Sequence, residues 1–141
     1  MVVITEDLVM AKVLIADDKD FIRKFVTQVI EGLGHEVVAV EDGVQGFEQI
    51  MAQVFDIAVV DENMGGVDKD GSRMMIRTKE AGRPLGRVIA ISDAFLLQKG
   101  DPAEEARLRE KWGVTWLVLL PKPFELEKMV GAIASLLAMP A

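Results

Sequence analysis

Cysteine is absent from the sequence, and histidine occurs only once. Without cysteine the chain can form neither a disulfide framework nor a thiolate metal site. The single histidine, His35, has no other ligand-forming residues clustered around it. It is therefore a poor candidate for a metal ligand or a phosphoacceptor.

Long hydrophobic runs and a basic leader are also missing. No apolar stretch approaches the roughly 20 residues that a membrane-spanning helix needs. The first residues, Met1–Asp7, lack the basic start of a secretory signal. We therefore expect a cytoplasmic protein with no membrane span.

Positive charge is in short supply. The sequence has 16 lysines and arginines and 23 acidic residues, which gives a formal net charge of −7. Nucleic-acid binding usually needs a basic face, so the composition argues against a direct nucleic-acid partner and leaves a protein partner open. Part of the acidity is concentrated in Asp17-Asp18 and Asp61-Glu62, where a metal cation would compensate it.

Short apolar runs alternate with amphipathic helical patterns along the 141 residues, half of which are hydrophobic. One globular domain is expected. Apolar strands that alternate with helices are typical of a parallel sheet covered on both faces, so the sequence predicts a doubly wound α/β fold. Ser72 and Asp101 are the expected caps of the third and fourth helices. The expected strands are 13–16, 35–40, 55–60, 87–91 and 114–120, and the expected helices are 21–33, 44–54, 72–81, 101–112 and 126–137.

Polar residues follow four of the predicted strands: Asp17-Asp18, Asp61, Ser92 and Lys122. In open parallel sheets, ligands bind outside the carboxyl ends of the strands. Several carboxylates at this edge would repel one another unless a cation neutralised them, and an oxygen-only ligand set suits magnesium. The pattern predicts a metal-assisted phosphate site.

Asp61 is the candidate nucleophile. A carboxylate that attacks phosphorus forms an aspartyl phosphate and needs charge neutralisation more than a general base. Lys122, between two prolines, would pair with the acids and then with phosphoryl oxygens, and Ser92 would donate its hydroxyl. Taken singly, each residue also has an ordinary structural role: a helix or turn cap for Asp17, Asp18 or Ser92, and a solvated acid or lysine for the others.

By its residues and their order, the chain resembles the receiver domains of response regulators in two-component signalling, from about Lys12 to Leu137. Segment 13–18 resembles the acidic pair of the family and 59–64 its phosphoacceptor segment. Segment 88–92 resembles its switch hydroxyl, and 122–124 its lysine.

The resemblance implies a CheY-like, flavodoxin-like fold with strand order 2-1-3-4-5. It implies that Asp61 accepts a phosphoryl group from a histidine kinase or a histidine phosphotransfer protein. It also implies that Mg²⁺ is held by Asp18, Asp61 and the backbone carbonyl of Asn63, with Asp17 assisting, partly through water.

We expect an N-terminal extension at 1–11, the receiver domain at 12–138 and a C-terminal tail at 139–141. Because no sequence remains for an effector domain, a stand-alone receiver is expected. Its output would be a contact with an unidentified protein or with a second copy of the chain as a homodimer.

Four departures from the family pattern predict an atypical output through the fourth helix and fifth strand. Gly65 stands where the family usually has proline, and the loop from there to Asp70-Gly71 is longer than usual. Asp93 adds charge after Ser92, and extra residues separate Ser92 from Lys122. Leu119, three positions before the lysine, replaces the usual aromatic residue.

Two other functions remain open. The altered loops are compatible with a degenerate receiver that serves only as a scaffold or dimerisation module, although all five polar site residues are retained. An aspartate-dependent phosphatase is less favoured, because such enzymes usually have a second acid two residues after the nucleophile, where this chain has Asn63.

Overall fold

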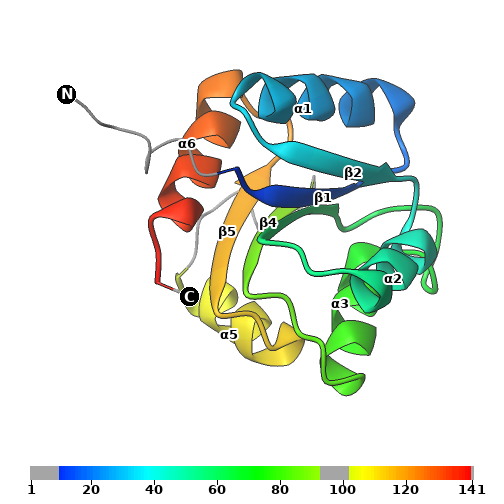
Figure 1. Cartoon of the computed structure of the whole chain (residues 1–141). Helices are drawn as coiled ribbons and strands as arrows, with labels where there is room; N and C mark the ends of the chain where they lie inside the picture. Colours follow the sequence, from blue (N-terminus) through cyan, green and yellow to red (C-terminus); the bar gives the residue numbers. More distant parts are fainter. Residues whose placement is uncertain (1–9, 93–101, 141) are drawn as a thin grey trace.

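A computed structural model describes residues 10–92 and 102–140, which form a five-stranded parallel sheet with helices on both faces (Figure 1). The strand order is β2-β1-β3-β4-β5. The predicted doubly wound fold and its strand order are therefore confirmed. The strands are β1 (Lys12–Ala16), β2 (Glu36–Val40), β3 (Ile57–Asp61), β4 (Arg87–Ser92) and β5 (Trp116–Pro121); the helices are α1 (Asp20–Gly32), α2 (Gly43–Ala52), α3 (Gly71–Glu80), α5 (Pro102–Trp112) and α6 (Leu126–Leu137).

The central strands are apolar without interruption because both of their faces are covered. Every residue of β3 is buried, as are Val13–Ala16 of β1 and Val88–Ser92 of β4. Continuous Val, Ile and Ala runs of this kind are typical of parallel sheets. The register places Ala16 beside Val60 and Asp61 beside Ile91, so the carboxyl ends of the central strands lie level with one another.

Alternate side chains of the sheet contribute to two hydrophobic cores. On one face, α1 and α6 pack against the sheet through residues such as Ile30 and Ile133. On the other face, α2, α3 and α5 pack through residues such as Ile50, Met75 and Trp112 (Figure 1). The described helices therefore cover both faces of the sheet. They do not cover its carboxyl edge in this way, and the polar side chains lie there.

The prediction that Ser72 caps the third helix is wrong. The helix begins at Gly71 with Asp70 in the cap position, and Ser72 lies inside its first turn. The Ser72 hydroxyl instead accepts a hydrogen bond of 3.2 Å from the indole N–H of Trp112 in α5. The other predicted cap, Asp101, lies outside the described residues, and α5 is described from Pro102 onward.

A lysine forms a second link between α3 and α5. The Lys79 Nζ donates to the carbonyl oxygens of Glu110 and Lys111 at 3.0 and 3.4 Å. These carbonyls belong to the last turn of α5, where backbone oxygens have no partner within the helix. The Lys79 ammonium therefore satisfies the end of α5 and favours its dipole.

Candidate phosphoryl and metal site

Four strand ends bring the predicted site residues to one edge of the sheet. Asp61 and Ser92 are the last residues of β3 and β4, whereas Asp17 and Lys122 directly follow β1 and β5. The backbone ladder continues past β5, because the N–H of Lys122 donates to the carbonyl of Ser92 at 2.9 Å. The positions of these side chains are therefore set by the sheet itself.

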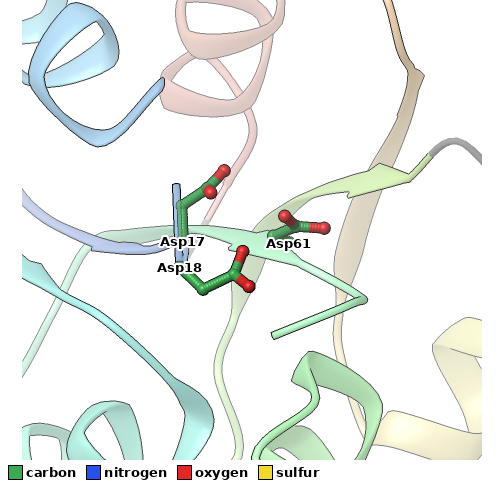
Figure 2. Close-up of side chains that lie close together, drawn as sticks. All are labelled: Asp17, Asp18 and Asp61. Carbon is green, nitrogen blue, oxygen red and sulfur yellow. The ribbon is translucent and has the colours of Figure 1, made fainter. Parts of the chain in front are cut away.

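Three carboxylates form the acidic part of the site (Figure 2). Ligand oxygens of Asp17, Asp18 and Asp61 all lie within 4.8 Å of one another. Asp17 and Asp61 are buried, at 1% and 0% exposed, and Asp18 is exposed to solvent. The cluster therefore combines two buried carboxylates with one that is exposed to solvent.

The two oxygens of Asp17 differ in their bonding. Oδ1 accepts the backbone N–H of Lys19 at 2.9 Å. Oδ2 is buried and accepts no hydrogen bond from any residue in the described ranges. A buried carboxylate oxygen without a partner is costly, and a metal ion is one group that would satisfy it.

Burial and the neighbouring carboxylates both act on the pKa of Asp17. Burial raises the pKa of its carboxyl above the usual value, and the charges of Asp61 and Asp18 raise it further. Its backbone hydrogen bond and the Lys122 ammonium act in the opposite direction. Burial, followed by the charge of Asp61, also raises the pKa of the neighbouring Glu62. Burial and nearby negative charge therefore disfavour the ionised forms of Asp17 and Glu62.

Lys122 provides the positive charge next to Asp61. Its Nζ lies 2.9 Å from Asp61 Oδ2, with the lysine side chain 17% exposed. The other oxygen of Asp61, Oδ1, accepts the backbone N–H of Asn63 at 3.1 Å. Both oxygens of the candidate nucleophile are thus oriented, and Ser92 is buried one residue beyond the register partner of Asp61, Ile91.

These residues fit a magnesium ion. The donors are carboxylate oxygens, which magnesium prefers, and Asp17 Oδ2 is left without a protein partner among the described residues. An ion at this place would reduce the repulsion between the carboxylates. The fourth protein ligand implied by the family resemblance is the carbonyl of Asn63, in the loop after Asp61.

The loop after Asp61 contains a residue that sequence reasoning missed. The Asp70 side chain accepts the backbone N–H groups of Met64 and Gly66, at 2.8 and 3.4 Å. No periodic pattern points to these bonds. The available signal was an aspartate placed directly before a helix start, and that position suggests a helix cap rather than a loop contact.

Two of the sequence departures have a structural account. Gly65 has φ +100°, which glycine adopts readily and which the ring of proline forbids. Leu119 is half-buried and packs against the core formed with α2, α3 and α5. Asp93 and the residues that follow it as far as 101 lie outside the described part of the chain.

The sequence profile of the response regulator receiver domain matches residues 13–134. The chain belongs to this family. Receiver domains act in two-component signalling, accept phosphoryl groups from histidine kinases and typically bind Mg²⁺ at an acidic pocket. They are typically signalling switches rather than classical enzymes.

Individual relatives support this assignment. The response regulator receiver protein CpdR of Brucella abortus (strain 2308) is 25% identical over 128 residues, which are 91% of this chain and 98% of that protein. The sensor protein GacS of Pseudomonas syringae pv. syringae is 35% identical over 72 residues, which are 51% of this chain and 8% of that protein. The chain spans less than a tenth of the length of the sensor proteins that it matches.

Solved structures agree with the fold. The receiver domain of the Francisella response regulator 1452 matches with a TM-score of 0.72 at 23% identity, and the match covers 89% of this chain and 95% of that one. Among the helices of residues 10–92 and 102–140, none is long and apolar enough to cross a membrane.

Proposed function

We propose that Asp61 accepts a phosphoryl group from a histidine kinase or a histidine phosphotransfer protein, in a Mg²⁺-dependent reaction that switches a protein contact. The observation that carries the proposal is the environment of Asp61. Its buried carboxylate is bound at 2.9 Å by the Lys122 ammonium and lies in a cluster with Asp17 and Asp18. Membership of the receiver family supports the same role.

In the proposed reaction, an Asp61 oxygen attacks the phosphorus of a phosphohistidine. A P–O bond forms while the P–N bond breaks, and the bonding electron pair returns to the imidazole nitrogen of the donor. Transfer of this kind depends on positioning and charge stabilisation more than on proton transfer. Asp61 is already oriented for it, because Lys122 and the Asn63 N–H hold its two oxygens.

The remaining residues have separate roles in the proposal. Mg²⁺ held by Asp17, Asp18, Asp61 and the Asn63 carbonyl would supply positive charge to the phosphoryl oxygens. The Lys122 ammonium would shift its attraction from the carboxylate to the transferred group. Ser92, at the end of β4, would donate its hydroxyl to a phosphoryl oxygen.

The output would be a change in the balance between two conformations of the face formed by α5 and β5. A phosphoryl group biases such a balance through the new charge and hydrogen bonds that it adds. Leu119 of β5 packs into the core beneath this face, whereas an aromatic residue is usual there. We therefore propose an atypical output surface, with an unidentified protein or a second copy of the chain as its partner.

Phosphorylation by a small donor tests the proposed function directly. The protein is incubated with acetyl phosphate and Mg²⁺, and its intact mass is measured with and without a chelator. The mass of one phosphoryl group should be added only when Mg²⁺ is present. Asp61→Asn should remove the addition. Asp68→Asn, an exposed change in the same loop, should keep it.

Absence of the added mass in the wild-type protein, or its persistence in Asp61→Asn, would reject the proposal and favour a scaffold. Transfer from a phosphorylated histidine phosphotransfer protein then tests the donor class. Oligomeric state measured by light scattering before and after phosphorylation tests whether a second copy is the output partner.

A further inference from the structure

The Asp70 carboxylate accepts hydrogen bonds from the loop before α3 and none from the helix itself. Asp70 occupies the cap position of α3, where an aspartate side chain often accepts a hydrogen bond from the first helical turn. Here the side chain makes no such bond. The backbone carbonyl of Asp70 accepts the N–H of Met74 at 3.1 Å, and the carboxylate is free of the helix and engages the loop.

Two carboxylates hold consecutive peptide groups of this loop from opposite ends. At the start, Asp61 Oδ1 accepts the N–H of Asn63 at 3.1 Å. At the end, Asp70 Oδ1 accepts the N–H of Met64 at 2.8 Å. Hydrogen bonds to ionised acceptors are stronger than those between neutral groups. The short stretch after the candidate nucleophile is therefore fixed on both sides.

The peptide group between Lys69 and Asp70 is held by Gly43, the first residue of α2. The N–H of Gly43 donates to the carbonyl of Lys69 at 2.7 Å. A Cβ at position 43 would lie 2.9 Å from the carbonyl oxygen of Asp70, so the two segments are in close contact. The carboxylate of Asp70 is thus presented from a supported position.

Planarity of the peptide bond transmits this contact to a carbonyl group. The N–H of Met64 and the C=O of Asn63 belong to one planar trans peptide and point in opposite directions. When Asp70 fixes the direction of the N–H, it also fixes the direction of the carbonyl. The negative charge at the N–H further polarises the peptide and increases the electron density on the carbonyl oxygen.

We propose that Asp70 is a positioning residue for the Mg²⁺ site, which it serves by orienting the Asn63 carbonyl as a metal ligand. This inference rests on the proposed function, because that carbonyl is a ligand only if the site binds Mg²⁺. Asp70 is not one of the three clustered carboxylates. It acts through the Asn63–Met64 peptide, as outer partners of metal ligands do elsewhere, and removal of such partners typically lowers metal affinity about 10- to 100-fold.

The choice of ion distinguishes positioning from general destabilisation. Mg²⁺ requires near-ideal octahedral geometry, whereas Ca²⁺ accepts variable geometry and more ligands. A misdirected carbonyl should therefore weaken Mg²⁺ binding more than Ca²⁺ binding. Partial unfolding would weaken both equally, because it reduces the apparent affinity for each ion by the same folded fraction.

The test is calorimetric titration of Mg²⁺ and of Ca²⁺ into the wild-type protein, Asp70→Ala and Asp70→Asn. In Asp70→Ala the Mg²⁺ Kd should rise about 10-fold or more, with a smaller rise for Ca²⁺. Asp70→Asn keeps an acceptor oxygen and should show a smaller change in the same direction. Asp68→Ala, an exposed change in the same loop, should match the wild type.

Each result has a defined meaning. The positioning role would be overturned if the folded Asp70 variant raised the Kd of Mg²⁺ and of Ca²⁺ by the same factor. An unchanged Mg²⁺ Kd in that variant would overturn it as well. Circular dichroism identifies which variants fold, and Asp70→Asn carries the comparison if Asp70→Ala does not. Failure of the wild-type protein to bind Mg²⁺ would instead reject the metal site, and with it the proposed function.

Discussion

The indole N–H of Trp112 donates a hydrogen bond of 3.2 Å to the hydroxyl of Ser72, which joins α5 to α3 beside the sheet. Trp112 is fully buried, so its polar N–H depends on this partner. The Lys79 contact to the end of α5 lies in the same pair of helices. These contacts fix α5, an element of the proposed output face, against α3, which begins at the loop after Asp61.

Ser72→Ala should therefore destabilise the protein although it removes only one oxygen atom. The change leaves the buried indole N–H without its acceptor, which costs about 1–3 kcal/mol. Urea unfolding followed by circular dichroism measures the loss. Ser135→Ala, on the exposed side of α6, is the matched control and should be neutral or slightly stabilising. Equal effects of the two substitutions would contradict the role of the Trp112 bond.

Lys122→Met should destabilise the metal-free protein. It leaves the buried Asp61 carboxylate without its ammonium partner, and breaking a buried ion pair from one side typically costs about 3 kcal/mol. The double variant Lys122→Met with Asp61→Asn should recover much of the loss, because no charge then remains unpaired at this position. Chemical unfolding of the wild type, Lys122→Met, Asp61→Asn and the double variant gives the coupling energy between the two residues. Lys128→Met, exposed on α6, should have little effect.

Asp17→Asn should stabilise the metal-free protein at neutral pH. The pKa of the Asp17 carboxyl is raised in the folded state by burial and by neighbouring charges, so the folded protein binds its proton more tightly than the unfolded chain does. This contribution favours folding at low pH and is lost as pH rises through the raised pKa. The advantage of the variant should therefore shrink as pH falls toward 3.8, the usual value.

Thermal unfolding across this pH range measures the effect of Asp17→Asn. With saturating Mg²⁺ at neutral pH the order should reverse, because the wild type keeps a metal-ligating carboxylate and a bound ion stabilises the folded state. If Asp17→Asn were less stable than the wild type at every pH in the absence of metal, the ionised Asp17 carboxylate would not be destabilising, and the prediction would be wrong.

Two glycine substitutions should have opposite effects. A Cβ at position 71 would lie 2.5 Å from the backbone oxygen of Asp61, so Gly71→Ala should push α3 away from the site and cost about 1–3 kcal/mol. Gly131 lies within α6 with nothing within 4 Å of an added Cβ, and Gly131→Ala should stabilise by about 0.5–1 kcal/mol. Thermal unfolding compares them, and equal signs would contradict the close approach at Gly71.

The fold and the polar edge were predictable because each depends on local pattern. Apolar runs that end in Asp61, Ser92 and Lys122 already indicate strands that deliver these side chains to one edge. The strand order came from family resemblance, because periodicity alone does not say which strands are neighbours. The role of Ser72 was predicted wrongly and that of Asp70 was missed. Both depend on contacts between separate segments, which the local capping preference does not contain.

The order of the strands along the chain has a consequence for the newly made protein. Asp17 and Asp61 lie at the ends of β1 and β3, which pair directly, whereas Lys122 comes 61 residues after Asp61. At about 5–20 residues per second of synthesis, the acids can meet on the ribosome seconds before their lysine is made. A nascent chain that contains Asp17 and Asp61 but not yet Lys122 should therefore depend on divalent cations more strongly than the finished protein does.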